Sequence, residues 1–178
     1  SGDMFMDKKI SDIGNKGLFT KEIDEGLLNN EINVGIHSLK DLPVELPKGL
    51  EIGAILKREN FREALISNKN ETLENLKKNA IVGTSSIRRK MQLKKKRPDL
   101  LVKDIRGNVD TRIKKLKERK FDAIILAYAG LKRLKVTYPF HIIDPRTIIP
   151  ALGQGAIALV VNKSNKEIKK IIAKLNHE

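Results

Sequence analysis

The sequence predicts an α/β protein in which one domain is inserted into another. Short apolar segments alternate with segments of helical periodicity through the middle of the chain, a pattern typical of parallel strands joined by right-handed crossovers. The flanking regions carry further strands and helices, and charged or glycine-rich segments separate them from the middle. A chain of 178 residues is long enough to bury one core or two small ones.

The first region predicts a helix followed by two strands. Apolar residues at near-helical spacing indicate a helix around residues 19–28, and a strand is expected at residues 31–37. Pro43 and Pro47 prevent a helix immediately afterwards. A second strand is therefore expected over residues 50–56, after a glycine that signals a turn.

After a charged connecting segment at residues 58–62, the middle of the chain alternates regularly between strands and helices. The expected strands cover residues 63–67, 80–83, 101–105 and 123–126. The expected helices cover residues 72–78, 86–96, 108–117 and 130–134. In sheets of this kind ligands bind outside the carboxyl ends of the strands. The segments that follow these strands are therefore expected to form a binding site.

The last region begins where two glycines flank Gln154, which indicates a bend or a crossing strand. An apolar stretch at residues 156–161 and a helix at residues 166–175 follow. We expect a ligand to bind in the cleft between two domains. The expected division is domain 1 at residues 1–57 and 156–178, domain 2 at residues 62–149, and crossings at residues 58–61 and 150–155.

The composition favours an anionic ligand. Lys and Arg number 36 against 22 Asp and Glu, and the resulting net charge of +14 attracts anions. Nucleic acid is one candidate, but only 4% of the residues are aromatic and no nucleic-acid-binding motif occurs. Many of the lysines can equally form a solvated surface. A small anionic molecule therefore remains the better prediction.

Other classes of site and location are excluded by what the sequence lacks. Without cysteine, the chain can form neither disulfides nor zinc thiolate sites. His37 and His141 lack metal-ligand spacing, so no metal site is expected. No apolar stretch approaches the ~18 residues of a membrane span, and no signal-peptide pattern occurs. These features predict a cytoplasmic protein without a membrane partner.

Three short motifs at the ends of expected strands carry the candidate chemistry. They lie at residues 37–41 (HSLKD), 84–89 (TSSIRR) and 106–112 (RGNVDTR). Two of them combine hydroxyl or amide groups with arginines, whose planar guanidinium groups suit carboxylates and phosphates. The first contains Asp41, the one acid placed to move a proton. Together they predict a pocket for a small ligand that carries several carboxylates or phosphates.

The two arginine motifs also have a purely structural interpretation. The hydroxyls of residues 84–86 can cap the helix that follows, with Arg88 and Arg89 simply exposed. Asn108 is expected to cap the next helix, and Gly107 allows close approach of the backbone. The same arrangement recurs at two successive strand ends, and this repetition favours a binding site.

The two charged residues that matter most have alternatives of their own. Arg112 lies one turn into its helix and can flank the binding site, or it can pair with Asp110 or Glu118 in solvent. Asp41 can act as a general acid and base, or it can cap the turn before Pro43. The residues of each motif by themselves leave these alternatives open.

Taken in order, the motifs resemble the porphobilinogen deaminase family, also called hydroxymethylbilane synthase. The segments that carry the resemblance are residues 14–19, 37–45, 83–89, 97–100, 106–112, 121–134 and 150–156. The resemblance implies a two-lobed fold like that of type II periplasmic binding proteins, followed by a third domain. It implies a transferase of heme biosynthesis that condenses four porphobilinogen molecules into a linear tetrapyrrole, hydroxymethylbilane, and releases ammonia at each step.

The resemblance also implies roles for individual residues. Asp41 would protonate the departing amine and stabilise the azafulvene cation. Other side chains would hold the acetate and propionate groups of substrate and cofactor, or lie close to them: Lys16, Ser38, Lys40, Ser86, Arg88, Arg89, Arg106, Arg112, Arg133 and Gln154. Thr84 and Asn108, which belong to the two arginine motifs, complete this set.

The family uses a dipyrromethane cofactor attached to a cysteine of the third domain, and this chain contains no cysteine. The chain also matches the family only from a point inside the first domain. We therefore expect a fragment that covers most of domains 1 and 2, is inactive alone, and belongs to a monomeric enzyme that acts on porphobilinogen and not on nucleic acid. The alternative is a stand-alone module of the same fold that binds a small polyanion without catalysis.

Overall fold

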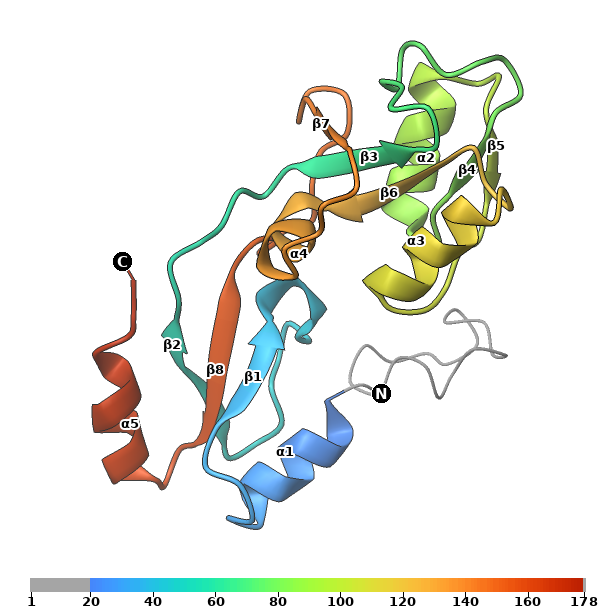
Figure 1. Cartoon of the computed structure of the whole chain (residues 1–178). Coiled ribbons are helices and arrows are strands. Elements are labelled where there is room, and N and C mark those ends of the chain that lie inside the picture. The colour runs from blue at the N-terminus through green and yellow to red at the C-terminus, as the bar shows by residue number, and fades with distance from the viewer. Residues whose placement is uncertain (1–19, 178) are drawn as a thin grey trace. The chain divides into compact units, whose positions relative to one another are not determined.

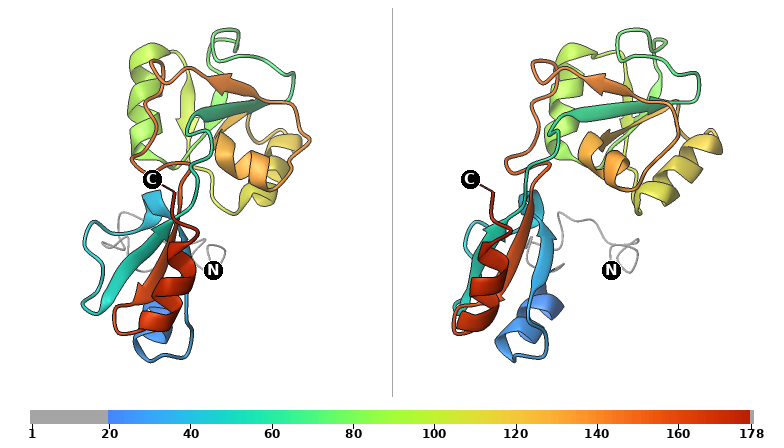
Figure 2. Two further views of the ribbon diagram at one scale, coloured as in Figure 1. Left: turned by 90° about the vertical axis from the view of Figure 1, so that its left-hand side faces the viewer. Right: turned by 60° about the vertical axis from the view of Figure 1, so that its left-hand side comes forward.

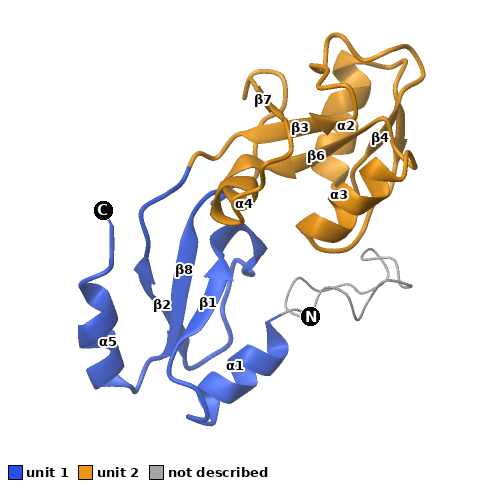
Figure 3. Ribbon diagram, in the orientation of Figure 1, with its two compact units in different colours: residues 1, 7–59, 152–178 blue, residues 2–6, 60–151 orange. Residues whose placement is uncertain are grey.

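The computed structural model describes residues 20–177, which form two compact units (Figures 1 and 3). Unit 1 contains residues 20–59 and 152–177, and unit 2 contains residues 60–151. The chain thus leaves unit 1, forms unit 2 and returns. Lys16 lies outside the described residues. No helix within residues 20–177 combines the length and the apolar character that crossing a membrane requires.

Unit 1 is a three-stranded antiparallel sheet with a helix on each face. Its elements are α1 (Lys21–Leu28), β1 (Gly35–Ser38), the 3-10 helix η2 (Leu39–Asp41), β2 (Leu50–Ile55), β8 (Ile157–Asn162) and α5 (Lys166–Ala173). The central strand, β8, pairs antiparallel with β1 and β2. Side chains alternate across a strand. Val160 therefore packs with Leu27 of α1, whereas Val161 packs with Ile172 of α5. The two helices accordingly lie on opposite faces of the sheet (Figure 2).

Unit 2 is a five-stranded mixed sheet in the order β5-β4-β6-β3-β7. Its elements are β3 (Glu63–Ser67), β4 (Ile81–Gly83), α2 (Ile87–Lys96), β5 (Leu101–Lys103), α3 (Val109–Lys117), β6 (Ala123–Ala127), α4 (Tyr128–Arg133) and β7 (His141–Ile143). Strand β4 runs parallel to β5 and β6, which confirms the predicted parallel pairing, and β3 runs antiparallel to β6 and β7.

The core of unit 2 lies on both faces of this sheet. On one face, Leu93 of α2 packs with Leu65 and Ile125. On the other, Leu116 of α3 and Leu131 of α4 pack with strand residues such as Ile66 and Ile124. Because both faces are covered, β3 is buried at all of its residues and β6 at all but the last. The sheet is therefore a rigid support for the side chains at its edges.

The helix predicted at residues 72–78 is wrong, because this segment forms turns. The guanidinium group of Arg97 donates hydrogen bonds to the carbonyl oxygens of Leu73, Glu74 and Leu76, at 2.5, 3.1 and 2.8 Å. A helix would require these carbonyls for its own bonds. Leu73 and Leu76 still pack into the core, so the apolar spacing reflects burial without a helix.

Other differences concern short elements. No strand was predicted at residues 141–143, but they form β7, which pairs with the outer side of β3. Strand β1 begins at Gly35, later than the predicted residues 31–37, and α4 begins at Tyr128, two residues earlier than predicted. Such short elements depend on pairing partners far along the chain more than on local pattern.

Candidate functional site

The corner between β4 and α2 is built by the hydroxyl groups of its first motif. Ser86 is the N-cap of α2, and its Oγ accepts a hydrogen bond from the backbone N–H of Arg89 at 3.4 Å. Thr84 is buried, and its Oγ1 accepts a bond from the N–H of Ser86 at 3.2 Å. These two hydroxyls therefore shape the turn that presents the first arginines of α2.

The corner between β5 and α3 has the same construction. Asn108 is the predicted N-cap, and this prediction is confirmed because its Oδ1 accepts a bond from the N–H of Thr111 at 2.8 Å. Gly107 has a φ of 105°, which favours glycine, and its carbonyl accepts a 2.6 Å bond from Nε of Arg112. The carbonyl of Arg106 accepts a bond from Lys115 Nζ at 3.0 Å.

Ser85, whose hydroxyl the sequence suggested only as a possible helix cap, joins the two corners. Ser85 Oγ donates to the carbonyl oxygen of Ile105 at 2.9 Å and accepts from the N–H of the same residue at 3.1 Å. Because β4 and β5 are parallel neighbours, their carboxyl ends lie together, and this side chain holds the two following turns side by side. Motifs that are separate in the sequence thus share one edge of the sheet.

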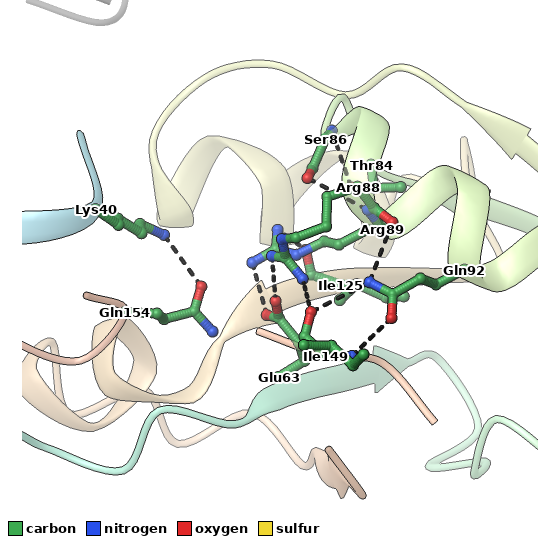
Figure 4. Close-up of polar contacts among 10 residues, drawn as sticks. All are labelled: Lys40, Glu63, Thr84, Ser86, Arg88, Arg89, Gln92, Ile125, Ile149 and Gln154. Carbon is green, nitrogen blue, oxygen red and sulfur yellow. Dashed lines mark hydrogen bonds and ion pairs between the residues drawn. The ribbon is translucent and has the colours of Figure 1, made fainter. Parts of the chain in front are cut away.

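Arg88 and Arg89 converge on one carboxylate that sequence reasoning missed (Figure 4). Arg88 Nη2 lies 2.6 Å from Oε1 of Glu63, and Arg89 Nη2 lies 2.7 Å from Oε2. Arg88 also donates to the carbonyl of Ile149, and Arg89 Nη1 donates to that of Ile125 at 3.0 Å. The one available signal was an acidic residue at the start of an otherwise apolar expected strand.

We call Arg88, Arg89 and Arg112 the arginine cluster. Burial alone would raise the pKa of the Glu63 carboxyl, but the charges and hydrogen bonds of Arg89 and Arg88 outweigh it and hold that pKa below its ordinary value. Burial, with the positive charge of Arg89 as a second cause, lowers the pKa of Arg112. The cluster therefore holds three guanidinium groups against one bound carboxylate.

Two details show that this positive charge is not fully compensated within residues 20–177. Nε of Arg89 is buried and has no hydrogen-bond partner in this part of the chain. Arg112 binds a carbonyl and forms no ion pair there with Asp110 or Glu118, the alternative that the sequence left open. A buried cation normally requires an anionic partner. The arginine cluster is thus chemically suited to bind the carboxylate or phosphate groups of a ligand.

Asp41, the predicted acid, lies in unit 1 on the 3-10 helix that follows β1. Strand β1 ends at the exposed Ser38, and the single turn of η2 then places Lys40 and Asp41. Asp41 is exposed, and no hydrogen bond or ion pair engages its carboxylate among the described residues. Its oxygens are therefore open to a ligand or to solvent.

The loop before β8 supports this turn. Gln154 is completely buried, and its Oε1 accepts a long 3.5 Å bond from Lys40 Nζ (Figure 4). Its carbonyl accepts a 3.0 Å bond from Nε of Arg58. Leu39 donates its N–H to the carbonyl of Ala156 at 3.1 Å. Gln154 thus lies beside Lys40 in unit 1.

The structure distributes the predicted site residues over both units. Arg88, Arg89 and Arg112 lie in one cluster, while Arg133 is the exposed last residue of α4. Unit 2 also contains Thr84, Ser86, Arg106 and Asn108, and unit 1 contains Ser38, Lys40, Asp41 and Gln154. Within residues 20–177, no group of three His, Asp or Glu side chains could hold a metal ion.

Two solved structures with a similar fold are solute-binding proteins. An ancestral cationic amino acid solute-binding protein, AncCDT-1, has a TM-score of 0.57 at 10% identity over 87% of this chain and 66% of its own. The probable amino-acid transporter binding protein YtmK of Bacillus subtilis has a TM-score of 0.52 at 16% identity over 89% and 68%. These likenesses show an α/β fold of the periplasmic binding-protein kind.

Sequence relatives are much closer. Porphobilinogen deaminase of Nitratiruptor sp. is 51% identical over 99% of this chain, and that of Sulfurimonas denitrificans is 50% identical over all of it. The chain spans 57% and 58% of the length of these two relatives. Residues 1–170 match the family described as porphobilinogen deaminase, dipyromethane cofactor binding domain. The chain therefore belongs to the porphobilinogen deaminase family.

Proposed function

We propose that the protein is a porphobilinogen deaminase, which condenses four porphobilinogen molecules into hydroxymethylbilane with release of ammonia at each step. The observation that carries this proposal is the uncompensated charge of the arginine cluster, where Arg89 Nε is buried without a partner among the described residues. Porphobilinogen carries one acetate and one propionate, and guanidinium groups bind such carboxylates in pairs of hydrogen bonds. The proposal includes the monomeric state and cytoplasmic location that the resemblance implies.

In this proposal Asp41 transfers protons. Each addition breaks the C–N bond of an aminomethyl group, and the nitrogen leaves as ammonia after it takes up a proton. A C–C bond then forms between the freed methylene carbon and the unsubstituted α-carbon of the neighbouring pyrrole, which loses a proton. Asp41 gives the first proton and accepts the last, so its carboxyl group returns to the protonated state in which the step began. Its exposed, unengaged carboxylate at the end of β1 supports this role.

The residues of unit 2 fit a dipyrromethane cofactor for the same reason that they fit the substrate, because both carry acetate and propionate groups. Ser86, Arg88, Arg89, Arg106 and Arg112 would hold these carboxylates. When bound, the cofactor supplies the pyrrole to which the first substrate is joined. A thioether to cysteine cannot form within these 178 residues, which contain no cysteine.

The Asp41→Asn variant of the complete protein tests the proposed reaction. The asparagine cannot donate or accept the proton, so we expect folding and cofactor content to remain and ammonia release from porphobilinogen to fall by a factor of about 100 or more. Asp110→Asn is a matched control, because Asp110 is exposed in the first turn of α3. Normal turnover in Asp41→Asn would exclude the proposed role.

A stand-alone polyanion-binding module remains the second candidate because of the net charge of +14. Calorimetry separates the two functions when the protein is titrated with a linear oligopyrrole, with inorganic phosphate and with short DNA. We expect the oligopyrrole to bind most tightly. Preference for DNA with a steep dependence on salt would instead identify a nucleic-acid-binding protein.

A further inference from the structure

Glu63 has no place in the proposed chemistry, yet it lies under the arginine cluster. Its side chain is completely buried, whereas the side chain of Arg88 is 29% exposed and that of Arg89 is 8% exposed. The backbone at Glu63 is fixed on both sides, because β3 pairs there with Ala127 of β6 and with Ile143 of β7. A carboxylate in this position cannot reach solvent, but it can hold the groups above it.

Each oxygen of Glu63 binds a different arginine, and each arginine has a second fixed contact. Arg88 donates through Nη2 to Glu63 and through Nη1 to the carbonyl of Ile149. Arg89 donates through Nη2 to Glu63 and through Nη1 to the carbonyl of Ile125. Two contacts on a planar guanidinium group define its plane. The contacts therefore fix the orientation of both guanidinium groups. The Nε atoms of the two arginines take no part in the bonds to Glu63.

The carbonyl of Ile149 is itself held in place. Gln92 accepts a bond from the N–H of Ile149 at 2.8 Å and donates one to its carbonyl at 3.1 Å. Gln92 lies one turn after Arg88 on α2, so its side chain ties the backbone of Ile149 to this helix (Figure 4). The second contact of Arg88 is therefore as well defined as its contact with Glu63.

Without Glu63 the cluster would consist of like charges close together. Burial and the positive charge of Arg89 already lower the pKa of Arg112. No carboxylate other than Glu63 pairs with Arg88 or Arg89 in the described part of the chain. Like charges repel, and flexible arginine side chains respond by turning toward solvent. A site of this kind binds well only when its donors are held in place before the ligand arrives.

We propose that Glu63 is a positioning residue that holds Arg88 and Arg89 in the orientation in which they bind the carboxylates of an acidic ligand, without touching that ligand. The inference rests on the proposed function, because that function identifies the acidic ligand as a pyrrole dicarboxylate. It makes a counterintuitive prediction. Removal of a negative charge from the site should strengthen anion binding by simple electrostatics, whereas loss of positioning should weaken it.

The test uses a pyrrole that carries acetate and propionate but no aminomethyl group, so that it binds without reacting, and its diamide as the uncharged comparison. Dissociation constants are measured by calorimetry on the complete protein. We expect Glu63→Gln to weaken binding of the dicarboxylate about tenfold and to leave binding of the diamide unchanged. Glu63→Asp keeps the charge and should recover part of the affinity.

Asp122→Asn is the matched structural control. Asp122 binds Lys77 Nζ at 2.8 Å and accepts a bond from the N–H of Ile81 at 2.8 Å, and within residues 20–177 it forms no hydrogen bond or ion pair with the arginine cluster. This variant should lower the melting temperature and keep the preference for the dicarboxylate over the diamide. A merely structural Glu63 would behave in the same way as this control.

The outcomes distinguish the inference from the proposed function. Equal or tighter dicarboxylate binding by folded Glu63→Gln overturns the positioning role alone. Failure of the unaltered protein to prefer the dicarboxylate overturns the proposed function and, with it, the positioning role. If Glu63→Gln does not fold, a structure of the unaltered protein with the dicarboxylate decides, because the proposal requires both arginines to keep their bonds to Glu63 in that complex. Release of either arginine from Glu63 would overturn it.

Discussion

The side chain of Ser85 and the backbone of Ile105 bind each other through two hydrogen bonds, of 2.9 and 3.1 Å. Ser85 follows β4, and Ile105 follows β5, so the pair continues the contact between two parallel strands beyond their ends. Arg88 and Arg89 begin one turn after the serine, and Arg106 directly follows the isoleucine. This single pair therefore sets the spacing between the two arginine-bearing corners.

Replacement of Ser85 by alanine tests this role. Ile105 is only 2% exposed, so its N–H and carbonyl would be left buried without partners. An unsatisfied buried polar group costs about 1–3 kcal/mol, and we expect the free energy of unfolding in urea to fall by about that amount. Ser164→Ala is the control, because Ser164 is exposed in unit 1 and, within residues 20–177, its hydroxyl bonds only to the nearby Asn162. Equal stability of the two variants would show that the Ser85 contact is not important.

Gly107 supports the second corner through its unusual backbone. Its φ is 105°, and a Cβ at this position would lie 2.6 Å from Cγ2 of Thr111. We expect Gly107→Ala to lower the free energy of unfolding by about 1–3 kcal/mol through backbone strain. It should also weaken binding of a pyrrole dicarboxylate, because the carbonyl of Gly107 holds Arg112.

Gly130→Ala provides the matched comparison for Gly107→Ala. Gly130 lies in α4, and a Cβ there would meet no atom within 4 Å. Alanine is the better helix former by about 1 kcal/mol, so this variant should be as stable as the unaltered protein or more stable. Denaturant titration of both variants checks the contrast. A loss of stability in Gly130→Ala equal to that in Gly107→Ala would contradict the argument from backbone conformation.

The stability of unit 2 should depend on acid through Glu63. Burial raises the pKa of this carboxyl, but Arg89 and Arg88 together lower it by a larger amount. The pKa in the folded protein therefore lies below the unfolded value of about 4.3. A carboxyl with a depressed pKa contributes its full stability above the unfolded pKa and loses it as the pH falls through the folded pKa.

We therefore expect Glu63→Gln to be less stable than the unaltered protein at pH 7, and this difference to shrink as the pH falls below about 4.3. Urea unfolding at a series of pH values measures the difference directly. Other carboxyls with lowered pKa values, such as Asp144 at about 2, remain in both proteins and cancel in the comparison. A difference that stays constant down to pH 2 would show that the Glu63 charge is not responsible.

Local pattern was sufficient to predict much of the scaffold. The strand at residues 63–67 has the predicted bounds, and the helices that begin after Ser86 and Asn108 start within one residue of their predicted positions. These elements could be predicted because their signals are local: an apolar run buried on both faces, or a capping side chain next to a helical repeat.

Contacts over long distances in the sequence decided the rest. Arg97 lies 24 positions after Leu73, and it takes up the carbonyls that a helix at residues 72–78 would need. Strand β7 forms because the outer side of β3 is there to pair with, which no pattern within residues 141–143 indicates.

The sequence by itself determined that this chain has an α/β fold, that arginine-rich corners follow its strands, and that Asp41 is the candidate acid. Only the tertiary structure decided which partners these side chains have. Glu63 lies 25 positions before Arg88, and Gln154 lies 114 positions after Lys40. Helix caps and strand runs are selected by interactions between neighbours in the chain, whereas a buried charge must find its partner in space.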